Sequence, residues 1–289
     1  MSAAFGARLA AAVDDHGPLC VGVDPHPGLL EAWGLPDDAS GLRDFGLRVV
    51  DAVGGRVAAV KPQSAFFERH GSRGVAALED VVAAARAAGT LVVMDAKRGD
   101  IGSTMGAYAD AYLRDGSPLA ADALTVSPFL GVGSLAPAVE AALGSGRGLF
   151  VLCLTSNPEG ATVQHARRGA GADVETVAAH VAREAARLNA PAVAAGDAMG
   201  SVGLVVGATT GDAAARTGTD LEAVAGPLLA PGVGAQGAGP AELAAVFGAA
   251  RRQVLASSSR GVLRAGPDAA ALRAAARSAA DEAHAALRG

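Results

Sequence analysis

Three charged residues near the end of an apolar segment are the clearest candidates for chemistry in this sequence. The segment Leu91–Met94 is followed by Asp95, Lys97 and Asp100. On a regular strand, side chains two positions apart point to one face, so Asp95 and Lys97 are expected to emerge together. Charged groups beside a buried strand are costly unless they pair. The pattern therefore predicts an ionic cluster at a strand end.

Lysine is scarce in this chain, which draws attention to the two lysines that are present. The sequence has 24 Lys and Arg residues, and only Lys61 and Lys97 are lysine. A compositional bias toward arginine explains the other cations without reference to function. Arginine does not release its proton near neutral pH, whereas lysine can. The two lysines are therefore candidate positions for proton transfer.

The composition limits the classes of protein to which the chain can belong. With 289 residues, 51% of them hydrophobic and 18% charged, it is expected to be globular, as one α/β barrel or two small domains. A net charge of −5, scattered basic residues and an aromatic fraction of 3% argue against binding of nucleic acid or an anionic membrane surface. No run approaches the roughly 18 apolar residues of a membrane span, and the N-terminus has no signal-peptide pattern.

The cysteines and histidines predict a reduced, metal-free protein. Cys20 and Cys153 lie inside apolar runs, which is typical of buried free thiols, and neither belongs to a CxxC pair. The six histidines show no HxH or HExxH spacing, so no metal site is predicted. We therefore expect a cytoplasmic protein.

Short apolar runs alternate with alanine-rich segments of helical period along the whole sequence. This alternation implies a parallel sheet with helical crossovers. Eight strands in a chain of this length predict an α/β fold, a (β/α)8 TIM barrel that forms a single domain over residues 1–289. A doubly wound open sheet is the alternative, because alternation does not reveal closure. The expected strands are 19–23, 56–60, 90–94, 123–126, 149–154, 202–206, 228–230 and 253–256, and the expected helices are 42–53, 75–88, 104–114, 135–143, 174–189, 241–248 and 268–287.

In such a barrel, functional residues follow the carboxyl ends of the strands. Asp24 follows the first expected strand, Lys61 the second, and Asp95 and Lys97 the third. The last two strands are followed by the glycine-rich segment 231–237 and by the segment 257–261, which contains Ser259 and Arg260. Loops at these places frequently bind phosphate, although two ordinary tight turns are the alternative.

The connection after the fifth strand is unusually long. Residues 156–173 include Pro158 and three glycines. Long connections in compact domains are usually functional lids or disordered insertions, and we predict a lid here.

The segment Asp95–Thr104 reads Asp-Ala-Lys-Arg-Gly-Asp-Ile-Gly-Ser-Thr. It resembles the Asp-x-Lys-x-x-Asp-Ile-x-x-Thr signature of the orotidine 5′-phosphate decarboxylase family, and the longer, type 2 subfamily matches best. The resemblance continues in family order over nearly the whole chain, at Val23–Pro25, Lys61–Glu68, Thr155–Pro158, Pro231–Gly237 and Ser259–Gly261.

This resemblance implies a carbon–carbon lyase. The family decarboxylates orotidine 5′-monophosphate to UMP and CO2 without a cofactor, as the last step of de novo pyrimidine synthesis. By resemblance, Lys97 is the acid that protonates C6 of the pyrimidine ring. Asp95 lies against the substrate carboxylate, and Lys61 holds Asp95 and a ribose hydroxyl.

The remaining site residues implied by the resemblance bind the substrate or the partner. Asp24 hydrogen-bonds the ribose, and Ser156 contacts the edge of the pyrimidine. The phosphate is held by Gln236, Ser259 and Arg260. Members of the family are homodimers with shared active sites, so Asp100, Ile101 and Thr104 are expected to reach into the partner's site.

Two other functions compete with this interpretation. A related Mg2+-dependent sugar-phosphate decarboxylase or aldolase shares the Asp-x-Lys-x-x-Asp motif, but such relatives carry a carboxylate after the second strand. This chain has Lys61 there, which would repel a metal ion. A non-catalytic nucleotide-binding barrel is the second alternative. It would not require the complete set of Lys61, Asp95, Lys97 and Asp100.

Overall fold

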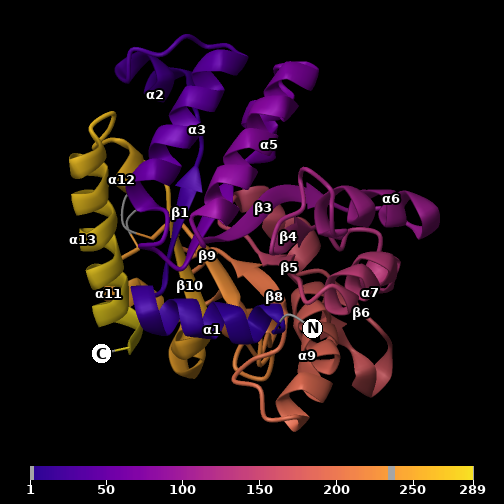
Figure 1. Cartoon of the computed structure of the whole chain (residues 1–289). Helices are drawn as coiled ribbons and strands as arrows, with labels where there is room; N and C mark the ends of the chain where they lie inside the picture. Colours follow the sequence, from indigo (N-terminus) through magenta and orange to yellow (C-terminus); the bar gives the residue numbers. More distant parts are fainter. Residues whose placement is uncertain (1–2, 234–237, 289) are drawn as a thin grey trace.

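The parallel strands of this chain close into a barrel (Figure 1). The computed structural model describes residues 3–233 and 238–288. Around the barrel the strand order is β1-β10-β9-β8-β5-β4-β3-β2, and each neighbouring pair is parallel. Pairing of β1 with β10 closes the ring, which confirms the (β/α)8 barrel and excludes the open sheet. The barrel strands are β1 (Leu19–Val23), β2 (Ala59–Pro62), β3 (Leu91–Arg98), β4 (Ala123–Val126), β5 (Gly148–Leu154), β8 (Val202–Val206), β9 (Leu228–Pro231) and β10 (Val254–Ser258).

Helices surround the barrel and occupy the connections between its strands (Figure 1). The longer helices are α1 (Phe5–His16), α3 (Ala39–Val53), α5 (Gly71–Ala87), α6 (Gly102–Leu113), α7 (Ala136–Gly144), α9 (Val177–Ala194), α11 (Pro240–Phe247) and α13 (Ala269–Arg288). The shorter helices are α2 (Pro27–Ala32), α4 (Ser64–Glu68), α8 (Ala161–Gln164), α10 (Ala213–Thr217) and α12 (Arg260–Leu263), and 3-10 turns cover Val132–Leu135, Pro158–Gly160, Gly171–Asp173 and Gly248–Gln253.

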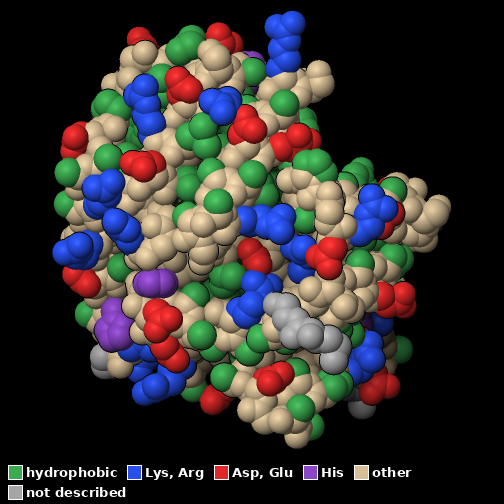
Figure 2. All heavy atoms as spheres, in the orientation of Figure 1, with side chains coloured by type: hydrophobic (Ala, Val, Ile, Leu, Met, Phe, Trp, Pro, Cys, Tyr) green, Lys and Arg blue, Asp and Glu red, His purple; other side chains and the backbone are tan. Residues whose placement is uncertain are grey.

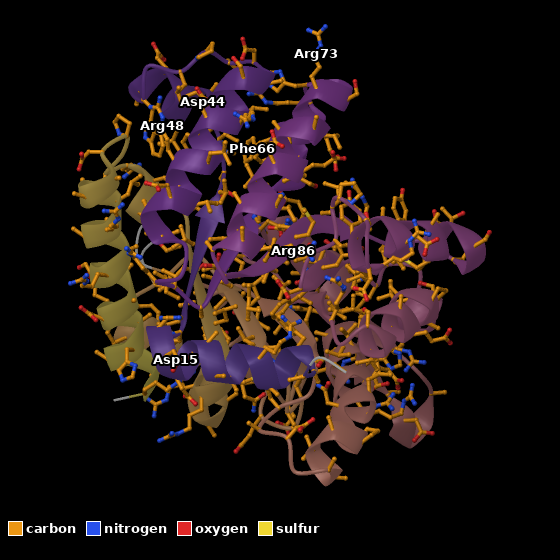
Figure 3. The ribbon with its side chains drawn as sticks, in the orientation of Figure 1. Asp15, Asp44, Arg48, Phe66, Arg73 and Arg86 are labelled. Atoms are coloured by element: carbon orange, nitrogen blue, oxygen red, sulfur yellow. The ribbon has the colours of Figure 1, made fainter. Side chains whose placement is uncertain are left out.

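The outer helices bury one face against the strands. In α3, Leu42, Phe45 and Val49 recur at helical spacing and are fully buried, whereas Asp44 and Arg48 are exposed. The Asp38 side chain caps this helix by accepting hydrogen bonds from the N–H groups of Ser40 and Gly41. On α5, Arg73 projects away from the molecule at the tip of the helix (Figure 3). These patterns place the main apolar core between the strands and the helical layer.

Helix α1 closes the amino-terminal end of the barrel, and it was not among the expected helices. Phe5, Leu9 and Val13 are spaced four residues apart and pack with apolar side chains of the barrel interior. The Phe5 ring meets the Phe150 ring edge-on, with centroids 6.0 Å apart. The side chain of Ala4 gives α1 no N-terminal hydrogen bond, so the segment lacks the cap that marks a helix start.

Two strand boundaries differ from the prediction in a way that matters for chemistry. Strand β2 covers 59–62 instead of 56–60, and β3 continues to Arg98. Lys61, Asp95 and Lys97 therefore lie within strands and not after them. The charged groups pair with one another, so the strands continue through residues that an apolar pattern would exclude.

The connection 156–173 contains short ordered elements. Within it, α8 is followed by β6 (Arg167–Arg168), which pairs antiparallel with β7 (Glu175–Thr176) just beyond the connection. The expected helix 174–189 accordingly starts later, at Val177.

Acidic and basic side chains are interspersed over the face shown in Figure 2.

Cys20 and Cys153 are free and buried, as predicted, and burial raises the pKa of each thiol to about 12. Across residues 3–233 and 238–288, no helix has both the length and the apolar character needed to cross a bilayer.

Candidate active site

A cavity of about 960 Å3 opens at the carboxyl ends of the barrel strands. Seven of the residues expected to act on or bind substrate line this one cavity, although they come from distant parts of the chain. They are Asp24, Lys61, Asp95, Lys97, Ser156, Ser259 and Arg260.

An ionic network forms the floor of the cavity. Asp95 Oδ2 accepts a hydrogen bond from Lys61 Nζ at 2.8 Å, and Asp95 Oδ1 accepts one from Lys97 Nζ at 2.5 Å. The Thr125 hydroxyl donates a third hydrogen bond to Asp95 Oδ1 at 3.0 Å. The Lys61 and Asp95 side chains are only 5% and 9% exposed, whereas that of Lys97 is 44% exposed. One carboxylate thus fixes two ammonium groups that both line the cavity, and that of Lys97 is the more exposed.

The network determines which protonation states are stable. Burial alone would raise the pKa of Asp95, but the neighbouring ammonium groups of Lys61 and Lys97 outweigh it and lower the pKa to about 2. Burial would lower the pKa of Lys61, yet the negative charges of Asp95 and Asp24 raise it above its usual value. Asp95 and Lys61 are therefore both charged near neutral pH.

Strand β3 is irregular where these groups emerge. Its pairing with β4 shifts register between Met94 and Arg98, and Lys97 has a φ of 48°. Positive φ is uncommon for a residue other than glycine and often marks functional positions. The simple alternation that led us to expect Asp95 and Lys97 together therefore does not describe this segment, although both side chains line the same cavity.

Beside the network, the wall of the cavity is built from the ends of the first and last strands, of which β1 pairs with β2. Asp24 follows β1, and its Oδ1 atom is buried without a hydrogen-bond partner within the described chain. Ser259 and Arg260 stand at the start of α12. A Cβ atom at Gly22 would clash with the Ser259 hydroxyl, so a glycine is needed for this close approach. An unpartnered carboxylate oxygen is well suited to accept a hydrogen bond from a ligand hydroxyl.

Of the remaining predicted site residues, three lie outside this cavity. Asp100 Oδ1 accepts a hydrogen bond from the backbone N–H of Ile101 at 2.8 Å, and the side chains of Ile101 and Thr104 are exposed. Gln236 lies outside the described residues.

Thr125 and Arg264 also line the cavity, and neither was among the predicted site residues. Thr125 is a polar residue in the otherwise apolar strand Ala123–Val126, a signal that could have identified it. Arg264 lies four residues after Arg260, which places both on one face of a helical turn. In the part of the chain that the structure describes, no three His, Cys, Asp or Glu side chains are grouped as a metal ion requires.

Comparison with known proteins gives one family throughout. A family model described as "Orotidine 5'-phosphate decarboxylase / HUMPS family" matches residues 17–275. The chain is 62% identical over 272 residues to the orotidine 5′-phosphate decarboxylase of Salinispora arenicola, which covers 94% of each chain. It is also 62% identical over 273 residues to that of Streptomyces coelicolor, again with 94% of each chain covered.

Solved structures agree with the sequence relatives. A crystal structure of a Streptomyces avermitilis protein assigned as an orotidine 5′-phosphate decarboxylase is 61% identical, covers 100% of this chain and 97% of its own, and has a TM-score of 0.93. The OMP decarboxylase of Leishmania donovani is 33% identical, with a TM-score of 0.76 and coverage of 99% of this chain and 100% of its own.

Proposed function

The chain belongs to the orotidine 5′-phosphate decarboxylase / HUMPS family, and on that premise we propose how its cavity converts orotidine 5′-monophosphate to UMP and CO2. This reaction is the final step of UMP biosynthesis, and the enzyme is a carboxy-lyase. The observation that carries the proposal is the Lys61–Asp95–Lys97 network in the cavity, in which Lys97 carries the more exposed ammonium.

Lys97 is the proton donor in this proposal. When the bond between C6 and the carboxylate breaks, its electron pair stays on C6 and CO2 leaves. A fixed ammonium beside C6 stabilises this charge and then transfers a proton to it, and the neutral amine regains a proton from water. Asp95 lies against the substrate carboxylate and holds Lys97, while Lys61 holds Asp95 and a ribose hydroxyl.

The rest of the cavity binds parts of the substrate that do not react. Asp24, with its unpartnered oxygen, accepts a hydrogen bond from the ribose, and Ser156 contacts the pyrimidine edge. Gln236, Ser259 and Arg260 bind the phosphate, with the guanidinium suited to a bidentate contact. Enzymes must lower barriers by about 8–23 kcal/mol, more than one lysine supplies. Binding of the remote phosphate helps by orienting the ring over Lys97.

We further propose that residues 156–173 act as a lid. The start of the segment lines the cavity at Ser156 and Asn157. Gln164 on α8 ties the segment back to Thr155, through hydrogen bonds to its backbone N–H at 3.0 Å and its hydroxyl at 2.7 Å. Closure over a bound nucleotide would exclude water from the reacting carbon.

A homodimer with shared sites is the proposed assembly. Ile101, Phe129 and Leu130 are 62%, 75% and 54% exposed, although they are large and apolar. They follow the adjacent strands β3 and β4, and the two loops touch where Ser127 N–H donates to Arg98 O at 2.7 Å. Burial of such side chains favours association. Asp100 and Thr104, which neighbour Ile101, would then reach the partner's cavity.

We also propose a cytoplasmic location. Two buried, unpaired cysteines, Cys20 and Cys153, fit a reducing compartment, where free thiols persist.

The proposal is tested by following decarboxylation of orotidine 5′-monophosphate by ultraviolet absorbance, with and without EDTA. We expect the wild type to form UMP at the same rate in EDTA. Lys97→Ala should lower kcat by about 10²–10⁴-fold, the usual contribution of a positioned general acid. Lys97→Arg should be similarly impaired, because it keeps the charge but not the transferable proton.

The control is Arg73→Ala, which removes an exposed cation at the tip of α5 and should leave kcat unchanged (Figure 3). Loss of activity in EDTA would favour a metal-dependent relative. Tight binding of UMP without turnover of the substrate would favour a non-catalytic nucleotide-binding barrel.

A further inference from the structure

The irregular part of β3 lies opposite a single residue of β4. In the ladder between these strands, residue 94 pairs with 124 and residue 98 pairs with 126. The three residues from Asp95 to Lys97 therefore face Thr125 alone. Extra residues in a strand disrupt the regular ladder of backbone hydrogen bonds, so the bulged segment needs other partners to hold its shape.

The Thr125 hydroxyl supplies such partners on both sides of the bulge. Its oxygen accepts a hydrogen bond from the backbone N–H of Lys97 at 2.9 Å, and it donates to Asp95 Oδ1 at 3.0 Å. A hydroxyl has one hydrogen to donate, so the donor of Thr125 is fully used by Asp95. The side chain is only 1% exposed, which shields both hydrogen bonds from water.

The backbone of Lys97 has a particular need for this contact. Its φ of 48° lies in the left-handed region, which costs free energy for a side chain that carries a Cβ atom. Such conformations persist only where their surroundings hold them. The contact from Thr125 acts on the N–H group of the strained residue itself.

We propose that Thr125 is a positioning residue for the decarboxylation, a role that rests on the proposed function. Its hydroxyl holds the backbone of Lys97 and the carboxylate of Asp95 in one arrangement, so that the Lys97 ammonium faces the carbon that loses CO2. Thr125 acts through these two residues and needs no contact with the reacting atoms.

The decisive comparison is between Thr125→Val and Thr125→Ser. Valine keeps the shape of threonine but removes the hydroxyl, whereas serine keeps the hydroxyl and removes the methyl group. Misplacement of a catalytic group by about 1 Å can cost about 10²-fold in rate, and we expect a loss of that order in kcat for Thr125→Val. Its KM should stay close to the wild-type value, because Asp24, Ser259 and Arg260 are untouched. Thr125→Ser should recover most of kcat.

The matched control is Thr90→Val. Thr90 is also buried, and its hydroxyl accepts a hydrogen bond from the N–H of Gly55 at 2.6 Å, but it precedes β3 at the opposite end of the barrel. This variant should lose stability without a loss of kcat. In Thr125→Val, hydrogen exchange of the Lys97 amide should be faster than in wild type, and the affinity for UMP should be retained.

Three results would overturn the inference: wild-type kcat in Thr125→Val, equal impairment of the valine and serine variants, or equal impairment of Thr90→Val. Failure of the wild type to decarboxylate its substrate would instead refute the proposed function. The amide-exchange measurement reports on the contact between Thr125 and Lys97 in either case.

Discussion

At the scale of single residues, the site is organised by one carboxylate. Asp95 accepts hydrogen bonds from Lys61, Lys97 and Thr125, so its two oxygens satisfy three donors on three strands. A buried charge is tolerated only when it is compensated in this way. Substitution of Asp95 should therefore affect folding as well as catalysis.

We predict that Asp95→Asn lowers the free energy of unfolding at pH 7 by about 3–5 kcal/mol, since it removes the carboxylate that forms the ion pair with the buried Lys61 ammonium. The double variant Asp95→Asn/Lys61→Met should be less destabilised than the single variant. Urea unfolding measures both. The control Asp44→Asn, on the exposed face of α3, should change the value by less than about 0.5 kcal/mol.

Part of this effect should depend on pH. The pKa of Asp95 falls from 3.8 to about 2 on folding, so its charged form stabilises the folded state above about pH 4. That contribution, about 2 kcal/mol, is lost as the pH falls through the folded value near 2. The difference between wild type and Asp95→Asn should therefore narrow between pH 4 and pH 2. A constant difference over that range would contradict the assignment.

At the scale of elements, the hairpin of β6 and β7 is held by a charged cluster centred on Glu175 of β7. Glu175 Oε1 accepts hydrogen bonds from Arg168 at 2.6 Å and Arg183 at 3.0 Å, and His180 Nδ1 lies 3.1 Å from the same oxygen. Arg183 and His180 belong to α9 of the scaffold. Strand β7 is thus tied to α9 through Glu175, while Arg167 and Arg168 of β6 remain exposed.

If the segment 156–173 is a lid, a bound nucleotide should protect it. We predict that saturating UMP slows tryptic cleavage after Arg167 and Arg168 by at least about tenfold, because cleavage requires local opening. Cleavage after Arg252, near the opposite end of the barrel, serves as the internal control for global stabilisation. Equal protection at both places would argue against a lid.

The sequence predicted most elements but not their irregularities. Apolar runs such as 19–23, 123–126 and 202–206 were located without error, because buried parallel strands are nearly continuous in apolar residues. The predicted third strand ended too early, at Met94, because the pairing of Asp95 with two lysines cannot be inferred from a local sequence pattern. The role of Thr125 was not predicted for the same reason, because it depends on a contact with Lys97, 28 positions away in the sequence. Helix α1 was missed because it has no capping side chain.

At the scale of the whole molecule, the cavity and the exposed apolar patch lie at the same end of the barrel. Ile101, Phe129 and Leu130 follow the strands that carry Asp95 and Thr125. A dimer formed through this patch would bring Asp100 of one chain close to the cavity of the other. The proposed assembly and the proposed catalysis are therefore linked, and one experiment can test both.

We predict that two inactive variants, Lys97→Ala and Asp100→Ala, restore activity when they are mixed and allowed to exchange subunits. In a mixed dimer with shared sites, one of the two sites receives wild-type Lys97 and wild-type Asp100. Random pairing should then recover about a quarter of wild-type kcat per site. If Asp100 acts within its own chain, no mixed site is complete, and the mixture should stay inactive.

Helix α1 has a consequence for the order in which the molecule is made. It precedes every strand that it plugs, and the ring closes only when β10, which ends at Ser258, pairs with β1. At ribosomal rates of about 5–20 residues per second, roughly 10–50 s pass between the synthesis of α1 and that of β10, the strand that completes the barrel against which α1 packs. Phe5, Leu9 and Val13 emerge before all the strands of the barrel but are buried only after the last of these strands has emerged. Plugging and closure of the barrel are thus late, linked events in the synthesis of each chain.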